Sequence, residues 1–368
     1  MIHSIDPAAG IPAYRQLYEL LRADITAGAY PYGSKAPSKR LLAEELGLSL
    51  ATVEHAYQLL CEEGYIEPRE RSGYFVSFLA DGSFAPPGEG FSGSPLPPAP
   101  VSQAESFPFS VLAKTMRGVL SSYGETILVK TPNSGCEALR SAISQYLSRS
   151  RGITARPAQI VIGSGAEYLY GLIVKMLGRE RIYGLEDPGY ARIKEVYQAE
   201  GAKCEMLPLG PSGIDSAALA ATGAAVLHIT PYRSYPSGVT ATASKRHEYI
   251  RWASQEGRCI IEDDFESEFS VSGKPEETLF ALAAREKAAD VIYLNTFTRT
   301  ISPSVRMGYM VLPEALLPLY EKTVGFYSCT VPAFEQYVLA ALISGGDFER
   351  HINRVRRKKR RESGQDSR

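Results

Sequence analysis

A proline- and glycine-rich stretch divides this chain into two parts that must fold separately. Residues 77–100 contain six prolines and four glycines and show no periodicity, which is typical of an extended tether. At about 3.1 Å per residue in polyproline II geometry, the tether reaches up to roughly 70 Å, enough to reach a partner subunit. We therefore expect a small module over residues 1–76, a linker over 77–105, a large domain over 106–350 and a tail over 351–368.

Residues 1–76 carry the pattern of three short helices followed by two strands. The first helix ends near Gly28, and its apolar residues share one face: Tyr14, Leu17, Leu21 and Ile25. Ser38 and Ser49 are expected to be the N-caps of a second and a third helix, with Gly47 as the stop between them. Two short helices joined in this way make a helix-turn-helix, and Gly73–Val76 is expected to be the second strand of a wing.

The segment 11–76 resembles the winged helix-turn-helix of GntR-type regulators, in the motif APSKRLLAEELGLSLATVEHAYQLLCEEGYIEPRERSGYFV. The resemblance implies that double-stranded DNA is the partner and that seven residues contact it: Ser38, Lys39, Arg40, Ser49, Thr52, Arg71 and Gly73. Two places depart from the family's pattern. Leu50 stands where many relatives carry an arginine, a potential base reader, and in the wing Arg71 and Tyr74 stand where glycine and threonine are common.

The charge of this module does not by itself favour DNA. Residues 1–76 contain seven Lys and Arg against ten Asp and Glu, a difference of −3, and the whole chain has a formal net charge of −1. Any attraction to nucleic acid must therefore come from local placement. A basic face is expected if five cations share one side: Lys35, Lys39, Arg40, Arg69 and Arg71. Otherwise the winged helix serves protein contacts.

Beyond the linker, strands alternate with helices, which predicts an α/β domain with a mostly parallel sheet between helices. The apolar run 160–162 is expected to be a buried strand, and the glycine-rich turn 163–166 opens a helix. Such a turn presents free backbone N–H groups to an anion. Close packing of a helix on a strand explains these glycines equally well, so the turn alone does not identify a site.

Polar segments follow four of the expected strands. Three of them are residues 186–190, 230–238 and 262–269. The fourth lies within residues 294–313, LNTFTRTISPSVRMGYMVLP, where a hydroxyl-rich, cationic loop joins two apolar runs. These segments resemble the aminotransferase-like domain of fold-type I pyridoxal phosphate (PLP) proteins. Together with the winged helix, they resemble the MocR subgroup of GntR regulators from residue 11 to about residue 361.

That resemblance implies a homodimer and an effector that is PLP or its adduct with an amino compound. It assigns eight residues to the cofactor site: Ser164, Gly165, Ala166, Tyr190, Asp263, Phe265, Arg299 and Arg306. Among them, Asp263 matches the carboxylate that pairs with the pyridine nitrogen, and Tyr190 matches the aromatic residue that stacks on the ring. Arg306 matches a phosphate-binding arginine.

Arg299 stands where these proteins carry the lysine that forms a Schiff base with PLP. That bond needs a primary amine that can lose its proton, whereas a guanidinium stays protonated up to a pKa of roughly 12 or more. Phe265 likewise stands at a tyrosine position and lacks the hydroxyl donor. We therefore expect no catalytic residue, no transaminase activity and no covalent bond to PLP.

Three functions remain open at this point. The first is a DNA-binding transcriptional regulator with a non-catalytic aminotransferase-like domain, the second a PLP-dependent transaminase, and the third a degenerate product without ligand response. Arg299 counts against the second, and the tether and winged helix favour the first. Five scattered cysteines indicate neither a zinc site nor a disulfide framework. We expect no metal site and, because there is no secretory signal or membrane span, a cytoplasmic protein.

The carboxyl-terminal part is expected to end in a basic helix. Phe348, Ile352 and Val355 make the apolar face of a helix that starts near Asp347, and no apolar residue follows Val355. We expect the helix end to be solvated and frayed; the alternative is that residues 354–361 add a non-specific DNA contact. The small domain that follows this helix in relatives is missing, so we expect a truncated chain with exposed apolar surface, low solubility or oligomers, and proteolysis after Val355.

Overall fold

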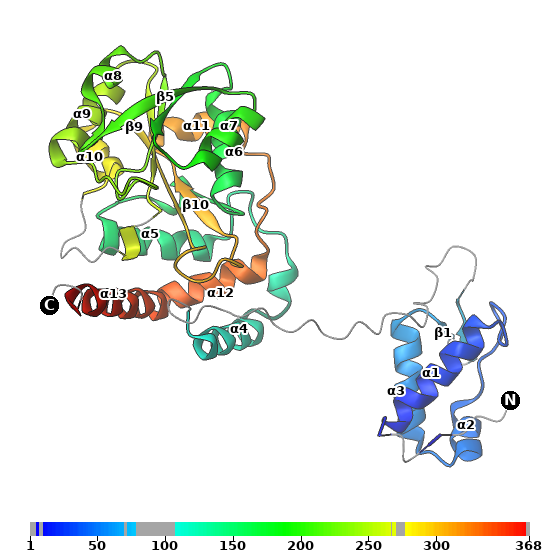
Figure 1. The fold of residues 1–368 in the computed structure, drawn as a ribbon. Helices are drawn as coiled ribbons and strands as arrows, with labels where there is room; N and C mark the ends of the chain where they lie inside the picture. Colours follow the sequence, from blue (N-terminus) through cyan, green and yellow to red (C-terminus); the bar gives the residue numbers. More distant parts are fainter. Residues whose placement is uncertain are drawn as a thin grey trace. The chain divides into compact units, whose positions relative to one another are not determined.

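The computed structural model of the protein describes residues 5–6, 10–69, 72–78, 107–265, 267–269 and 277–365. The chain forms two compact units, Met1–Ala99 and Pro100–Arg368 (Figure 1).

The small unit contains the three helices and two strands that the sequence predicts. Its elements are α1 (Ala13–Thr26), α2 (Lys39–Leu46), α3 (Leu50–Glu62), β1 (Ile66–Arg69) and β2 (Gly73–Val76). The two strands pair antiparallel, from Ile66 opposite Val76 to Arg69 opposite Gly73. The core forms where α1 and α3 bury their apolar faces, with Leu17, Leu21, Val53, Tyr57 and Leu60 almost fully covered.

Two residues define the turn between α2 and α3, one where α2 ends and one where α3 begins. Gly47 adopts a φ of +63°, a left-handed conformation that glycine enters without steric cost, and so ends α2. The Ser49 hydroxyl accepts a hydrogen bond from the Thr52 backbone N–H at 3.1 Å and so caps α3. Ser38 occupies the N-cap position of α2, but its side chain makes no capping hydrogen bond.

The large unit is built on an eight-stranded sheet in the order β3-β10-β9-β8-β7-β4-β5-β6. The strands are β3 (Ile160–Gly163), β4 (Ile182–Asp187), β5 (Lys203–Gly210), β6 (Gly213–Ile214), β7 (Val226–Ile229), β8 (Cys259–Asp263), β9 (Asp290–Thr296) and β10 (Gly308–Val311). The central pairs β9-β8-β7-β4-β5 are parallel, whereas β10 and β6 run antiparallel to their neighbours. This confirms the expected α/β class.

Helices cover both faces of the sheet (Figure 1). One face carries α6 (Ala166–Leu177), α7 (Ala191–Ala199) and α11 (Leu317–Thr323). The other carries α4 (Phe109–Tyr123), α5 (Glu137–Arg151), α8 (Ser216–Ala221), α9 (Ala243–Ala253), α10 (Leu279–Glu286), α12 (Ala333–Ser344) and α13 (Asp347–Gln365). Strand residues alternate between the two layers, so Ile292 packs with α6 and Tyr293 with α5. Short 3₁₀ turns are η1 (Gly124–Leu128), η2 (Pro157–Gln159), η3 (Ser267–Phe269) and η4 (Glu314–Leu316).

Helix α13 begins at Asp347 and buries Phe348, Ile352 and Val355, as predicted. The expectation that it frays after Val355 is wrong, because the helix continues to Gln365. Arg356 Nε donates to the Glu268 carbonyl oxygen at 2.6 Å, and Lys359 Nζ lies 5.1 Å from the centre of the Phe269 ring. These two contacts hold the next turn against η3, so proteolysis directly after Val355 is not favoured.

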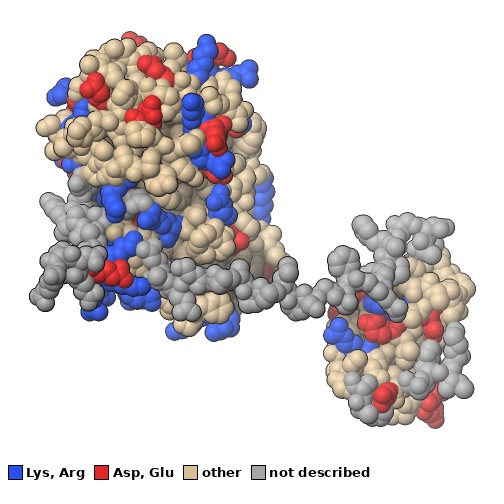
Figure 2. All heavy atoms as spheres, viewed as in Figure 1, with Lys and Arg blue, Asp and Glu red and all other residues tan. Residues whose placement is uncertain are grey.

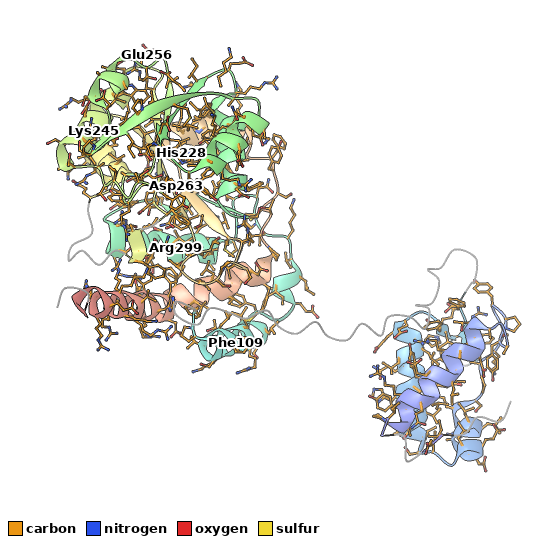
Figure 3. All side chains as sticks on the ribbon, in the orientation of Figure 1. Phe109, His228, Lys245, Glu256, Asp263 and Arg299 are labelled. Atoms are coloured by element: carbon orange, nitrogen blue, oxygen red, sulfur yellow. The ribbon has the colours of Figure 1, made fainter. Side chains whose placement is uncertain are left out.

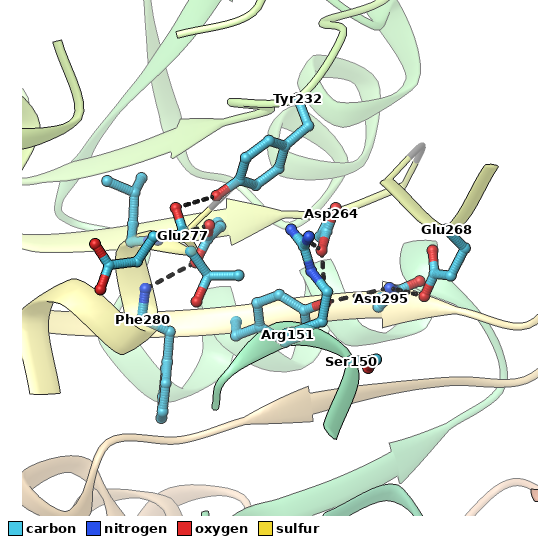
Figure 4. A network of polar contacts seen from close by, with 12 residues as sticks. Ser150, Arg151, Tyr232, Asp264, Glu268, Glu277, Phe280 and Asn295 are labelled. Atoms are coloured by element: carbon cyan, nitrogen blue, oxygen red, sulfur yellow. Dashed lines mark hydrogen bonds and ion pairs between the residues drawn. The ribbon is translucent and has the colours of Figure 1, made fainter. Parts of the chain in front are cut away.

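A buried polar network joins α5 to the ends of β8 and β9 (Figure 4). Arg151, the last residue of α5, lies with its guanidinium 2.8 Å from the Asp264 carboxylate, and both side chains are buried. Tyr293 donates to Asp264 at 2.7 Å, and Asn295 donates to Glu268 at 2.7 Å. Because a buried charge without a partner is costly, this ion pair fixes the end of α5 against β8.

Replacing Arg151 by Ala is expected to lower the free energy of unfolding of the large unit by about 3–5 kcal/mol, because Asp264 is left buried without its counter-charge. The matched control is Arg149→Ala, whose partner Glu349 is 2.8 Å away but whose side chain is half exposed, so about 0–1 kcal/mol is expected. Urea titration followed by the fluorescence of Trp252, the single tryptophan, reports on this unit. Equal losses in the two variants would contradict the role of the buried pair.

Candidate functional site

The carboxyl ends of the parallel strands border a cavity of about 540 Å³ in the large unit. Six of the eight residues that the sequence assigns to a cofactor line it: Ala166, Tyr190, Asp263, Phe265, Arg299 and Arg306. Figure 3 shows Asp263 and His228 near the strand ends and Arg299 on the segment after β9. Open α/β sheets commonly bind ligands at this edge.

The start of α6 forms one wall of the cavity. Gly165 has a φ of +97°, and a Cβ built on it would lie 3.6 Å from an Arg306 guanidinium nitrogen, so the glycine backbone and Arg306 are neighbours. Arg306 also lies 3.4 Å from the Glu167 carboxylate. Ser164 precedes this turn and is not among the described residues that line the cavity. A helix N-terminus beside a guanidinium favours an anion such as a phosphate.

Asp263 lies at the end of β8 and is held by residues that the sequence did not predict. Tyr170 of α6 donates a short hydrogen bond to the Asp263 carboxylate, and His228 Nε2 lies 3.4 Å from the same oxygen. The other ring nitrogen of His228 is 2.6 Å from the Tyr197 hydroxyl. Burial, followed by the negative charge of Asp263, holds the pKa of Tyr170 well above its usual value, so its hydroxyl remains a donor.

Tyr170 and His228 were missed because each lies within an apolar run. The helix AEYLYGLIVKML and the strand VLHI both have the pattern of buried packing residues. The one signal in the sequence was His228 itself, since a histidine inside a fully buried strand needs a polar partner.

Arg299 lies against Phe265, with its guanidinium carbon 5.5 Å from the ring centre. The described residues that line the cavity include three arginines and no lysine. One of them, Arg233, adopts a φ of +57°, a left-handed conformation that non-glycine residues rarely take and that is frequent at ligand sites. The cavity therefore offers cationic forks for an anionic ligand and, among these residues, no amine that could attack a carbonyl.

A second cavity of about 230 Å³ adjoins the first and shares Tyr190, Ile193 and Thr230 with it. Its lining includes Lys194 and the buried carboxyl group of Glu186. The Ser234 hydroxyl donates to Glu186 at 2.6 Å. Burial nevertheless raises the pKa of Glu186 to about 7.

The starts of α2 and α3 carry the residues that the sequence assigns to DNA contact. Ser38, Arg40 and Ser49 are exposed and Thr52 is half-buried. Arg71 lies outside the described residues. Leu50, the first residue of α3, is 42% exposed, so an apolar side chain stands at a position where a base reader would be placed.

Three of the five predicted cations surround wing strand β2. A Cβ on Gly73 would lie 3.2 Å from the Lys35 side chain, Lys39 lies 5.3 Å from the Tyr74 ring, and Arg69 lies 4.4 Å from the Phe75 ring. Lys39 also forms an ion pair with Glu54 of α3 at 2.9 Å. The positive charges are therefore gathered near the wing, although Glu54 partly neutralises Lys39.

The part of the chain that the structure describes offers neither a cluster of His, Cys, Asp or Glu metal ligands nor a helix suited to crossing a membrane. Within it, no group of three or more His, Cys, Asp or Glu side chains could hold a metal ion. None of the described helices is both long and apolar enough to cross a membrane.

Two family models match the two units. Residues 13–76 match the family described as bacterial regulatory proteins, gntR family, and residues 103–366 match aminotransferase class I and II. YdeL of Bacillus subtilis (strain 168), described as an uncharacterized HTH-type transcriptional regulator, is 33% identical over 95% of this chain and 78% of its own length. The probable rhizopine catabolism regulatory protein MocR of Rhizobium meliloti is 30% identical over 96% of this chain and 76% of its own length.

Among solved structures, the large unit resembles LysN, the α-aminoadipate aminotransferase of Thermus thermophilus, complexed with N-(5'-phosphopyridoxyl)-L-leucine. The two are 28% identical with a TM-score of 0.60, and the match covers 68% of this chain and 64% of that one. An archaeal alanine:glyoxylate aminotransferase matches at 23% identity and a TM-score of 0.59, over 67% of this chain and 62% of that one, which shows the fold alone. The chain thus spans less than two thirds of either aminotransferase.

The raised pKa of Glu186 predicts that stability falls as pH rises from about 5 to 7. In that window the folded state keeps a proton that the unfolded chain has lost, so the free energy of unfolding decreases by roughly 1.4 kcal/mol per pH unit. Glu186→Gln should flatten this slope by about that amount, because the amide does not titrate. Glu195→Gln, at an exposed carboxylate, is the control. Urea titrations at several pH values measure both, and identical slopes would refute the assignment.

Proposed function

The chain belongs to the family of HTH-type transcriptional regulators that join a GntR domain to an aminotransferase class I and II domain, and from this we propose that it binds operator DNA and a PLP-type effector without catalysing transamination. The proposal places it in the cytoplasm. The observation that carries the ligand part is the cavity lined by Asp263, Arg299 and Arg306, which suits an anionic ring compound and has no lysine among its described lining residues. A transaminase is not proposed, because that chemistry needs an amine at the position of Arg299.

The DNA-binding part is supported by the exposed starts of α2 and α3 and by the cations around β2. A helix-turn-helix places the N-terminal turn of its second helix against base edges in the major groove, while a preceding helix meets the phosphates. Here that second helix is α3, and Arg40 is exposed in the first turn of the preceding helix, α2. Arg40 is therefore assigned to a phosphate contact rather than to base reading.

Arg40→Ala is expected to weaken binding to all duplex sequences and to lower the slope of log K against log salt by about 0.9, the contribution of one phosphate contact. Thr52→Ala should cost only about 1 kcal/mol, since it removes a neutral hydroxyl. Arg22→Ala, on α1 and paired with Glu19, is the control of equal charge. Fluorescence anisotropy with the DNA upstream of the protein's own gene and with a random duplex measures these effects. A loss confined to one base position would instead make Arg40 a base reader.

The cavity residues fit PLP as a non-covalent ligand. The N-terminus of α6 and Arg306 would hold the phosphate, Asp263 would hold the ring nitrogen, and Tyr190 would pack on the ring. Asp263 is prepared for this task because Tyr170 and His228 fix its carboxylate. When bound, PLP supplies an electrophilic carbonyl and an electron sink.

Purified chain mixed with PLP is expected to bind it in equilibrium dialysis but to yield no stoichiometric borohydride-stable adduct on a residue that lines the cavity. Arg306→Gln should weaken retention at least tenfold, because it removes a charged phosphate contact. The double change Arg299→Lys with Phe265→Tyr should produce an adduct at residue 299, mapped by peptide mass spectrometry. An adduct at Lys194 or within residues 294–313 of the unchanged chain would overturn the non-covalent assignment.

A homodimer is part of the proposal, supported by exposed apolar side chains on the large unit. Phe109, Leu128, Val129 and Phe326 are 65–82% exposed. Asn133 donates to the Gly325 carbonyl oxygen at 2.9 Å, which brings the segments of Val129 and Phe326 close together. Exposed apolar residues such as these favour association with a second copy.

Leu128→Asp combined with Phe326→Asp is expected to convert the dimer into a monomer, because each change would bury a charge in the interface. Sedimentation equilibrium at several concentrations measures the mass. Tyr32→Asp, at an exposed aromatic residue of the small unit, is the control. A monomer for the unchanged chain, or a dimer that survives both substitutions, would contradict this surface.

A further inference from the structure

Helix α13 (Asp347–Gln365) has two faces of different chemistry. Its inward face buries Phe348, Ile352 and Val355, and Arg356 and Lys359 then contact η3. Residues 354–361 contain seven Lys and Arg and one Val. Because the inward contacts fix the rotation of the helix, four of the other cations lie together on the opposite face, and Arg360 lies on the flank between the two faces.

The outward side carries four exposed cations at spacing i, i+3, i+4 and i+7: Arg354, Arg357, Lys358 and Arg361. Residues with this spacing lie on one helical face, over about 10 Å of helix length. No Asp or Glu occurs between residues 350 and 361. The nearest acids in the sequence are Glu349, paired with Arg149 at 2.8 Å, and Glu362, 3.8 Å from Lys358. We name Arg354, Arg357, Lys358 and Arg361 the basic stripe.

The stripe is rich in positive charge although the whole chain has a net charge of −1. Figure 2 shows Lys and Arg side chains at the edge of the large unit where Figure 1 draws α13. Arg354 also lies 3.0 Å from the His351 ring, and Arg357 donates to the Asn353 carbonyl oxygen at 3.3 Å.

Duplex DNA is the polyanion that this surface fits best. Its backbone carries one negative charge per 1.7 Å or so of axis, so a row of cations over two helical turns can meet several phosphates. An amphipathic membrane helix would need exposed apolar residues beside its cations, and the apolar residues of α13 are buried. The proposed function already brings DNA to this chain, which raises the local DNA concentration at the large unit.

We propose that the basic stripe of α13 is a second, sequence-independent contact with the DNA backbone, carried by the large unit and additional to the winged helix. It rests on the proposed function in that the same chain binds DNA. Arg and Lys at these positions need only charge to bind phosphates, so the contact strengthens binding to any duplex and carries no base specificity.

The test compares two full-length triple variants with equal loss of charge. The stripe variant is Arg357→Gln, Lys358→Gln and Arg361→Gln, and the control variant is Lys203→Gln, Arg251→Gln and Lys322→Gln, all exposed on the large unit. A random duplex of about 40 base pairs serves as the probe, and binding is followed by fluorescence anisotropy between about 50 and 200 mM salt. Circular dichroism checks that both variants keep their helical content.

The stripe variant is expected to lower the slope of log K against log salt by about two to three, and the affinity at about 100 mM salt at least tenfold. The control variant should change the slope by less than one. Arg357→Lys with Arg361→Lys should keep wild-type binding, because it keeps the charges. Equal slopes for the stripe and control variants would overturn the proposal.

The outcomes also separate this inference from the proposed function. In one outcome the unchanged chain binds DNA, Arg40→Ala weakens that binding, and the stripe variant binds DNA as tightly as the unchanged chain. The winged helix is then the DNA contact, and the stripe is not. If the unchanged chain binds no duplex at all, the proposed function fails. Binding of the unchanged chain to anionic phospholipid vesicles, lost in the stripe variant while DNA binding is retained, would assign the stripe to a membrane and overturn the proposal.

Discussion

Three consecutive carboxyl groups at the end of β8 must be buried together, and the large unit is arranged around that requirement. Because strand residues alternate between faces, Glu262 and Asp264 point to one helical layer and Asp263 to the other. Glu262 accepts from the Leu279 and Phe280 backbone N–H groups at 2.8 and 2.9 Å, which form the N-terminus of α10. Burial raises its pKa to about 7. Asp264 is compensated by the cation at the end of α5, and Asp263 by hydroxyl and imidazole groups.

Each of these partners ties another element to the same strand end, so the cavity is bounded by parts that cannot move independently. Glu262 holds α10, Asp264 holds α5, and Asp263 joins α6 to β7 through Tyr170 and His228. A buried charge separated from its partner costs several kcal/mol, which makes such links more rigid than apolar packing of similar area. The ligand-facing Asp263 is therefore positioned by the same contacts that stabilise the sheet edge.

Local signals in the sequence predicted the elements well and their polar partners poorly. Turn residues such as Gly47 and Ser49 act within a few positions, so the helix-turn-helix and the strand ends could be found from pattern. The partners of Asp263 and Asp264 lie far along the chain, and Arg151 at a helix end has the pattern of an exposed residue. The error at α13 has a related cause: the pattern counts apolar side chains, whereas Arg356 and Lys359 pack through a carbonyl oxygen and an aromatic ring.

The residues that line the cavity at the strand ends determine how fast a bound molecule would dissociate. A group attached to a protein amine as a Schiff base leaves only after that bond is hydrolysed or exchanged, which adds a chemical step to its release. A group held by guanidinium forks and hydrogen bonds dissociates on the time scale of ordinary complexes, so its occupancy follows the free concentration around the Kd. With three arginines and no lysine among its described lining residues, the cavity would release an anionic ligand without a bond-breaking step, so its occupancy would rise and fall repeatedly within the life of one protein molecule.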